Sequence, residues 1–206
     1  MPGRSDPPVQ RPALVLASAS PRRLDLLRQI GVVPDRVVPA DVDETPAPRE
    51  LPLDHARRLA GDKAAVVAAP GHFTLAADTV VACGRRILPK PEDAAGVRAC
   101  LNLLSGRRHR VHTGVCVIAP DGRRALRVVT TVVQMARLTD AMAAAYIASG
   151  EGQGKAGGYA IQGRAARFVT QISGSYTNVV GLPVWETAQM LMGLGYPVDR
   201  APAGPP

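Results

Sequence analysis

An aspartate lies in the middle of an otherwise apolar segment. Asp78 is flanked by Leu75-Ala76-Ala77 on one side and by Val80-Val81 on the other, a run typical of a strand that is buried on both faces. Because a buried, unpaired carboxylate is costly, we expect Asp78 to meet a cation, a metal ion or a water molecule that it activates. A buried salt bridge to an arginine is the alternative without catalytic meaning.

Three lysines stand out in a chain that otherwise uses arginine for positive charge. The chain has 22 arginines, and its lysines are Lys63, Lys90 and Lys155. Lysine offers a compact ammonium and arginine a planar guanidinium, so a retained lysine is a candidate for a site that needs the compact charge. Lys63 falls on the apolar stripe of a predicted helix and is expected to point inward. Lys90 lies between two prolines, which favours a stiff segment that aims its ammonium; chance survival and a plain surface loop are the alternatives.

The segment Ser18-Ala19-Ser20-Pro21-Arg22-Arg23 predicts a turn that leads into a helix, with Ser20 as N-cap and Pro21 at the first helical position. The free N–H groups of a helix N-terminus suit a phosphate. Two arginines in a first turn are electrostatically unfavourable, which indicates an anion nearby. The chain has neither a Walker A motif nor GxGxxG, and a capped helix with solvated arginines is the alternative.

Carboxylates gather in a Pro-rich loop, where Asp41-Val42-Asp43-Glu44 occurs. Convergent carboxylates are the ligands that Mg²⁺ prefers, with water and phosphate in its remaining positions. A solvated acidic loop is the alternative. Zinc is not expected, because the three cysteines form no CxxC pair and the close histidines His109 and His112 have no third histidine near them.

Strands that alternate with helices predict an α/β or mixed α+β architecture that positions these side chains. Six glycines occur among residues 150–163, which indicates either a mobile or a closely packed loop. We expect strands at 13–17, 36–39, 73–82, 111–119 and 125–135, strand and turn at 168–180, and helices at 21–30, 54–69, 91–104, 139–149 and 183–192.

The composition narrows the class of protein. Hydrophobic residues make up 46% and charged residues 20%, which favours a packed core over disorder. No apolar run approaches the roughly 20 residues of a membrane-spanning helix, and the N-terminus lacks a signal-peptide core, so we expect a soluble cytoplasmic protein without a membrane partner. The net charge of +8 suggests nucleic acid, but aromatic residues make up only 3%. A smaller polyanion such as a nucleotide fits better than nucleic acid.

Taken together, these motifs resemble the Maf family of nucleotide pyrophosphatases. The resemblance runs from Leu14 to about Pro183 and implies a mixed α/β fold with a long curved sheet, flanking helices and two lobes around a cleft, as in the inosine-triphosphate pyrophosphatases. We expect one such domain at 13–199 between disordered segments 1–12 and 200–206, and a homodimer stays open. The matching segments are LASASPRR (16–23), VDE (42–44), DKA (62–64), AADTVV (76–81), KP (90–91), LSGRRHRVHTGV (104–115), GKAGGYAIQG (154–163) and GSYTNVVGLP (174–183).

The activity that this resemblance implies is hydrolysis of a nucleoside triphosphate between its α- and β-phosphates, which gives a monophosphate and pyrophosphate. It implies a divalent metal, Mg²⁺ or Mn²⁺, with Glu44 and Asp78 as metal ligands and Asp78 also as the proton acceptor. The substrate-binding residues that it implies are Ser18, Arg22, Arg23, Lys63, Thr79, Lys90 and Gln162.

Arg23, Thr79 and Gln162 resemble the members that act on dTTP and UTP, whereas a sister group prefers 7-methyl-GTP. A glutamine amide can donate to a pyrimidine carbonyl and accept from the ring N3–H, and we expect Thr79 or Arg23 to hold that amide. Another base preference and a non-catalytic, nucleotide-binding regulator of septum formation remain alternatives. The chain departs from the family at Gly61-Asp62, where an Arg-Glu-like pair is common, and at Gly150-Glu151-Gly152-Gln153.

Overall fold

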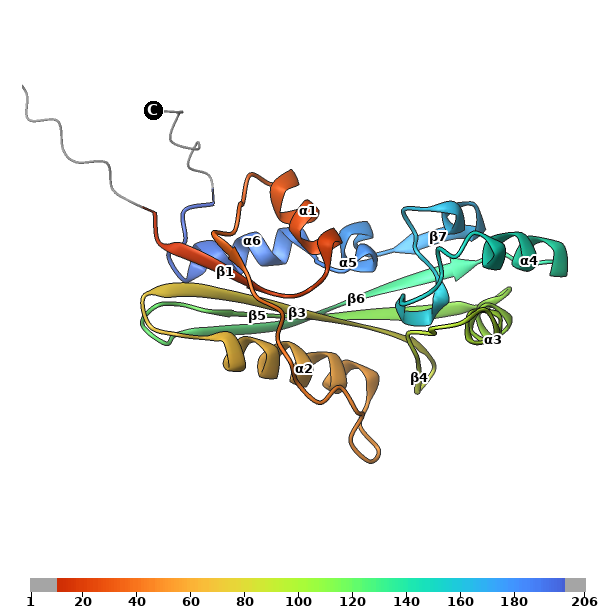
Figure 1. Ribbon diagram of the computed structural model, residues 1–206, viewed down its shortest axis with the longest axis horizontal. Coiled ribbons are helices and arrows are strands. Elements are labelled where there is room, and N and C mark those ends of the chain that lie inside the picture. The colour runs from red at the N-terminus through yellow and green to blue at the C-terminus, as the bar shows by residue number, and fades with distance from the viewer. Residues whose placement is uncertain (1–10, 199–206) are drawn as a thin grey trace, which may run out of the picture.

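The computed structural model describes residues 11–198, which form a mixed sheet of seven strands with helices on both faces (Figure 1). The strand order is β2-β1-β3-β5-β6-β7, and β4 pairs with β3. β1 runs parallel to β2 and β3, and all other pairs are antiparallel. The predicted mixed α/β fold is therefore confirmed. The strands are β1 Ala13–Ala17, β2 Arg36–Val37, β3 His72–Cys83, β4 Arg86–Leu88, β5 Arg108–Ile118, β6 Arg124–Met135 and β7 Val169–Ser173.

The helices divide between the two faces of the sheet. α2 packs against β3 and β5 on one face, while α1, α5 and α6 lie on the other (Figure 1). α3 and α4 pack together near one end of the sheet. No helix in the described range is long and apolar enough to cross a membrane. The helices are α1 Pro21–Gln29, α2 Pro52–Val67, α3 Ala94–Leu104, α4 Asp140–Ala148, α5 Tyr176–Val180 and α6 Val184–Gly193, with the 3₁₀ turns η1 Ala156–Gly158 and η2 Arg164–Phe168.

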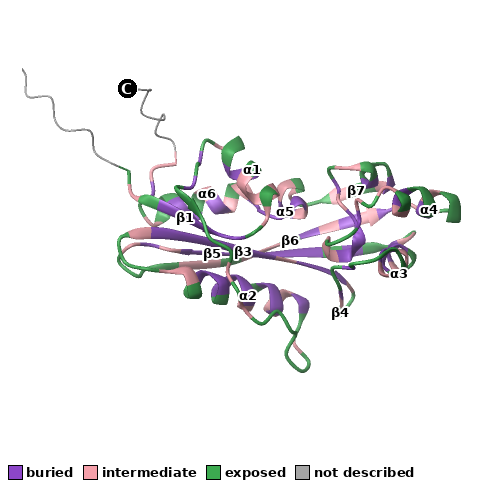
Figure 2. Ribbon diagram, in the orientation of Figure 1, coloured by how far each residue is buried: buried purple, intermediate pink, exposed green. Residues whose placement is uncertain are grey.

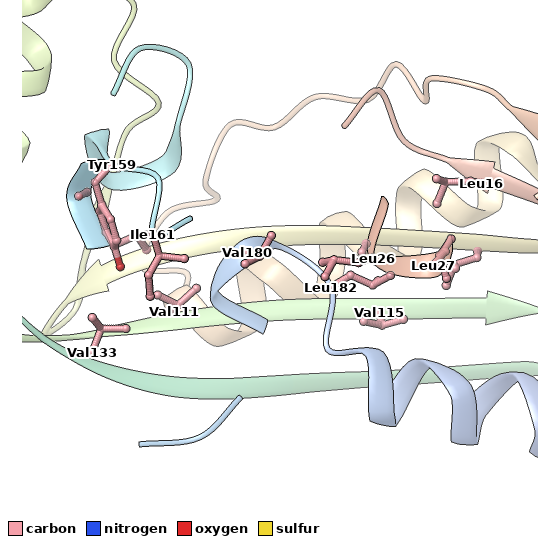
Figure 3. Packing of buried hydrophobic residues seen from close by; sticks show 14 of the residues in the cluster. Leu16, Leu26, Leu27, Val111, Val115, Val133, Tyr159, Ile161, Val180 and Leu182 are labelled. Carbon is pink, nitrogen blue, oxygen red and sulfur yellow. The ribbon is translucent and has the colours of Figure 1, made fainter. Parts of the chain in front are cut away.

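The main hydrophobic core lies between the sheet and the helices on the α1 side. Buried residues line the strands and the inner helix faces, and exposed residues cover the outer faces (Figure 2). In Figure 3, Leu26 and Leu27 of α1 lie near Val115 of β5, with Val180 and Leu182 beside them. Alternate residues of β5 face this core, and the residues between them face α2.

Gly114 of β5 faces α2, and its lack of a side chain brings the helix close to the sheet. A Cβ atom at this position would overlap the backbone oxygen of Ala56 in α2. Gly114 is paired in register with Asp78 of β3. The close helix–sheet contact therefore lies directly beside the carboxylate that the sequence analysis singled out.

Two expectations about local structure are wrong. The helix expected from residue 91 begins at Ala94, because the N-cap is Asp93, whose side chain accepts a hydrogen bond from the backbone N–H of Gly96. The segment 168–180, expected as strand and turn, does contain the strand β7, but its second part is helix α5, which Ser175 caps and Gly181 ends. Ser20 is the N-cap residue of α1 as expected, but its side chain makes no capping hydrogen bond.

The expected disordered segments 1–12 and 200–206 fall largely outside the described residues. Arg11 is within the described range and is bound from two directions. Its guanidinium forms a salt bridge with Asp35 at 2.9 Å and donates to the hydroxyl of Tyr196 at 2.7 Å. These contacts tie the start of β1 to the chain that leads into β2 and to the segment after α6.

Candidate active site

The candidate site lies at a gap in the sheet, where β3 has no neighbouring strand along a short part of one edge. β1 pairs with β3 as far as Ala76, and β4 begins to pair with it at Val81, while β5 pairs continuously along the other edge. Successive side chains of a strand point to opposite faces. Asp78 and Thr79 lie in this gap, so residues from both faces of the sheet can meet there.

A cavity of about 400 Å³ occupies this gap and brings the sequence-predicted residues together. Its walls come from the turn before α1, the acidic loop, α2, β3, the segment after β4 and the glycine-rich segment 150–163. The predicted site residues that line it are Ser18, Arg22, Arg23, Glu44, Lys63, Asp78, Thr79, Lys90 and Gln162.

Lys63 bridges the two predicted carboxylates. Its Nζ donates to Asp78 Oδ1 at 2.6 Å and also to Glu44 Oε1. Lys63 is 7% exposed and Asp78 is 3% exposed, so this ion pair lies between α2 and β3 away from bulk water. The inward orientation expected of Lys63 is confirmed, and the partner of Asp78 is a lysine rather than an arginine.

Glu44 joins two lysines at the mouth of the cavity. Its second oxygen accepts from Lys90 Nζ at 2.7 Å. Burial raises the pKa of Glu44, but the hydrogen bonds from Lys63 and Lys90 outweigh that effect and lower the pKa to about 2. Glu44 is therefore ionised at neutral pH and supplies a full negative charge beside two ammonium groups.

The loop that carries Glu44 is fastened to α2 by a partly buried ion cluster. Glu50 accepts from Arg58 Nε at 2.8 Å, lies 2.9 Å from His55 Nδ1, and also accepts from the backbone N–H of Ala47. The Arg58 guanidinium then donates to the backbone oxygen of Thr45 at 3.0 Å. The acidic loop is thus not freely solvated, because these contacts hold the chain on the C-terminal side of Glu44.

Arg23 is held by several neutral acceptors. It donates to Ser18 Oγ at 2.8 Å, to Thr79 Oγ1 at 3.2 Å and to the backbone oxygen of Gly181 at 2.9 Å. Arg22 donates to the backbone oxygen of Val180 at 3.3 Å. Burial lowers the pKa of both arginines. Neither arginine forms a salt bridge with a carboxylate of the described chain, which leaves both free to attract an anion.

The glycine-rich segment packs closely against the chain on both sides of Lys90. The backbone N–H of Gly154 donates to Pro91 O at 2.7 Å, and that of Gly157 donates to Pro89 O at 2.9 Å. Further along, Tyr159 is buried and its hydroxyl lies 2.7 Å from His109 Nε2. Figure 3 shows Tyr159 and Ile161 near Val111 and Val133 of the sheet. Of the two alternatives for this segment, the closely packed one holds.

Gln162 lies at the cavity, but the support expected for its amide is absent. Its side chain is exposed and makes no hydrogen bond to Thr79 or Arg23. Those two residues bind each other, and Thr79 Oγ1 also lies 3.0 Å from Thr113 Oγ1. Arg23 and Thr79 therefore hold each other rather than the Gln162 amide.

The cavity also contains Lys155, which the sequence analysis named as a candidate without a role, and two backbone oxygens that sequence reasoning missed. Lys155 lies in its lining, and the rarity of lysine in this chain was the available signal. The backbone oxygens of Val180 and Gly181 bind the two arginines, and no side-chain pattern could have indicated them.

The donor set fits a divalent cation that is shared with a phosphate rather than enclosed by protein. Within residues 11–198, no group of three or more His, Cys, Asp or Glu side chains lies together as metal ligands. Glu44 and Asp78 both line the cavity. Mg²⁺ commonly takes one or two carboxylates and completes its shell with water and substrate phosphates.

The chain is similar to several known proteins. A dTTP/UTP pyrophosphatase of Paramagnetospirillum magneticum is 68% identical over 185 residues, covering 89% of this chain and 97% of that protein. A dTTP/UTP pyrophosphatase of Caulobacter vibrioides is 65% identical, covering 90% and 97%. A solved dITP/XTP pyrophosphatase of Mycobacterium abscessus aligns with a TM-score of 0.43 and 18% identity over 88% of this chain and 94% of that one. The family described as Maf-like protein matches residues 13–194, and the chain belongs to the Maf family.

Proposed function

We propose that this protein is a nucleoside triphosphate pyrophosphatase that hydrolyses dTTP and UTP to the monophosphate and pyrophosphate. The observation that carries the proposal is the charge of one cavity, which is lined by five cationic side chains and two carboxylates. Its volume is in the range of small-molecule sites. Family membership and relatives named dTTP/UTP pyrophosphatase support the same activity.

In this proposal Asp78 accepts a proton from the attacking water. Lys63 binds Oδ1 of Asp78, and Oδ2 has no hydrogen-bond partner in residues 11–198, so one oxygen is free to take the proton. The Lys63 ammonium fixes the orientation of the carboxylate. General-base catalysis of this kind contributes about 10²- to 10⁴-fold to a rate.

The cationic side chains bind the triphosphate and offset its charge. Phosphoryl transfer gains mostly from positioning and from electrostatic stabilisation of the phosphate oxygens. Arg22 and Arg23 are held through backbone and hydroxyl acceptors, so their orientation is set before the substrate arrives. Such preorganisation spares the cost of ordering these side chains during the reaction.

Glu44 and Asp78 would hold the divalent cation, Mg²⁺ or Mn²⁺. When bound, the cation supplies positive charge to the phosphate oxygens. Glu44 is ionised throughout the neutral range, because Lys63 and Lys90 hold its pKa at about 2. It is therefore ready to bind a cation without first losing a proton.

Base choice in this proposal rests on Arg23, Thr79 and Gln162. The Gln162 amide makes no hydrogen bond to the other two, so the base itself would supply its partner. Uracil and thymine share the O4 and N3–H groups that such an amide can pair with. This common edge accounts for activity on both dTTP and UTP.

A panel of nucleoside triphosphates tests the proposal. Pyrophosphate and inorganic phosphate are measured separately with dTTP, UTP, CTP, dATP and 7-methyl-GTP in the presence of Mg²⁺ or Mn²⁺. We expect pyrophosphate from dTTP and UTP at far higher kcat/KM than from the others. A preference for 7-methyl-GTP would assign the chain to the sister group, and no turnover with any of them would favour a non-catalytic role. The cytoplasmic location, the homodimer and the absence of nucleic-acid and membrane partners stay predictions.

A further inference from the structure

The three lysines of this chain all line the same cavity. Lys63, Lys90 and Lys155 are the only lysines among 25 basic residues, and each of them lies in the cavity wall. Of the 22 arginines, only Arg22 and Arg23 do so in the described part of the chain. A chain that otherwise uses arginine therefore keeps lysine at one place, which indicates that a compact ammonium is needed there. Lys155 shares this placement but has no assigned role.

The backbone of Lys155 is held firmly against the segment that carries Lys90. Hydrogen bonds from Gly154 to Pro91 and from Gly157 to Pro89 lie on either side of the two lysines. Gly157 has a φ of +72°, and a Cβ atom there would lie 2.8 Å from the side chain of Val81, so glycine is required for this close contact. The two lysine-bearing segments thus form one rigid wall of the cavity.

The ammonium of Lys155 has no negative partner. It donates only to the backbone oxygen of Gln153 at 3.3 Å, and no carboxylate of residues 11–198 forms a salt bridge with it. Burial and the positive charge of Arg22 both lower the pKa of Lys155. Two cations that repel each other across a cavity are stabilised when an anion binds between them.

The charges of the cavity fall into two groups. Lys63 and Lys90 are bound to Glu44 and Asp78, so two cations balance two carboxylates. The other three cations form no salt bridge with a carboxylate in the described chain: these are Arg22, Arg23 and Lys155. Arg23 donates to three neutral acceptors, whereas Arg22 and Lys155 each donate to one backbone oxygen. These three residues therefore carry the excess positive charge of the cavity, and Arg22 and Lys155 have the fewest hydrogen-bond acceptors of their own.

We propose that Lys155, together with Arg22, binds the pyrophosphate half of the triphosphate. This inference rests on the proposed function. The β- and γ-phosphates carry most of the negative charge of the substrate, and they leave as pyrophosphate when the α–β bond breaks. The electron pair of that bond stays on the departing oxygen, so cations without carboxylate partners stabilise it best. Lys63 and Lys90 remain with the carboxylates and the scissile phosphorus.

Binding of inorganic pyrophosphate tests this assignment without turnover. Its affinity in the presence of Mg²⁺ is measured by calorimetry for wild type, Lys155→Met and Lys155→Arg, alongside the affinity of dTMP. A charged hydrogen bond of this kind is worth about 10- to 100-fold. We expect Lys155→Met to weaken pyrophosphate binding by that factor and to leave dTMP binding nearly unchanged. We expect Lys155→Arg to remain weakened, because the compact ammonium is lost.

Arg127→Met provides the matched control, because Arg127 is exposed, forms no salt bridge within residues 11–198 and lies outside the cavity lining. It removes one positive charge and should leave both affinities unchanged. Thermal melting of each variant confirms that it is folded.

Equal pyrophosphate affinity in wild type and Lys155→Met overturns the inference. An equal loss of dTMP affinity in Lys155→Met, or a Lys155→Arg variant that binds pyrophosphate like wild type, overturns it as well. If wild type itself does not hydrolyse dTTP, the proposed function fails instead, so the two failures can be told apart.

Discussion

Gly114 of β5 lies directly opposite Asp78 of β3, and the missing side chain of the glycine is what brings α2 within reach of that carboxylate. The backbone oxygen of Ala56 occupies the space that a Cβ atom of residue 114 would need. Lys63, two helical turns further along α2, then donates to Asp78 at 2.6 Å. A packing residue with no polar side chain thus sets the geometry of the central ion pair.

Substituting this glycine should therefore affect both stability and activity. Gly114→Ala forces α2 away from the sheet, and overpacking of this kind costs about 1–3 kcal/mol of unfolding free energy. The Lys63–Asp78 distance should also increase and lower kcat. Thermal unfolding and steady-state rates on dTTP measure both effects. Gly193→Ala is the control, because no atom of the described residues lies within 4 Å of the added Cβ atom, so the melting temperature of this variant should not fall. A Gly114→Ala protein as stable as wild type would contradict the role of this contact.

Asp78→Asn should separate chemistry from folding. Asparagine has the same shape but cannot accept the proton of the attacking water, so we expect turnover to fall by about 10²- to 10⁴-fold. The measurement is kcat on dTTP, with the melting temperature as the check on folding. A folded variant with wild-type turnover would remove Asp78 from the mechanism.

Lys63 and Lys90 should not tolerate arginine. A guanidinium is larger and planar, and at Lys63 it would have to fit a site that is 7% exposed between two carboxylates. We expect Lys→Arg to lower kcat/KM nearly as much as Lys→Met at each position. Arginine variants with wild-type kinetics would show that only generic positive charge is required.

Much of the site could be predicted from the sequence, because it depends on local patterns. An apolar run around Asp78 indicates a buried strand whichever neighbours it has, and the stripe on α2 turns Lys63 inward on its own periodicity. The two prolines around Lys90 act locally as well. These features survive into the structure because no distant contact is needed to produce them.

Other features could not be predicted, because they arise from contacts between segments far apart in the chain. The register that sets Gly114 opposite Asp78 is one example. Packing of the glycine-rich segment against Pro89 and Pro91 is another, since glycine content alone is compatible with mobility. The Gln162 amide, which makes no hydrogen bond to Thr79 or Arg23, is a third, since the three residues come from segments far apart in the chain.

The partly buried ion cluster at the acidic loop predicts how stability depends on pH. Hydrogen bonds from Arg58 lower the pKa of Glu50 to about 2, against an ordinary value of 4.5. A carboxyl group whose pKa is lower in the folded protein stabilises the fold above its unfolded pKa. That contribution is lost as the pH falls from about 4.5 towards 2. Unfolding free energy measured over this window should decline less steeply in Glu50→Gln than in wild type. Identical slopes would contradict the assignment.

Gln162 should govern discrimination between UTP and CTP. Cytosine reverses both hydrogen-bonding roles of the uracil edge, and a mispaired polar group costs about 1–3 kcal/mol. Arg23 and Thr79 do not hold the amide in one orientation, so the bound nucleotide itself must fix it, and the penalty for cytosine falls at the low end of this range. We expect a UTP preference in kcat/KM that Gln162→Ala reduces. A strong preference that survives the substitution would place base recognition elsewhere.

The products formed from dTTP test the central claim most directly. Wild type and Asp78→Asn are incubated with dTTP and Mg²⁺, and dTMP, dTDP, pyrophosphate and inorganic phosphate are quantified together. The account predicts equal amounts of dTMP and pyrophosphate from wild type and a severe loss of both in Asp78→Asn. Formation of dTDP with inorganic phosphate, or an Asp78→Asn protein that releases pyrophosphate at the wild-type rate, would contradict it.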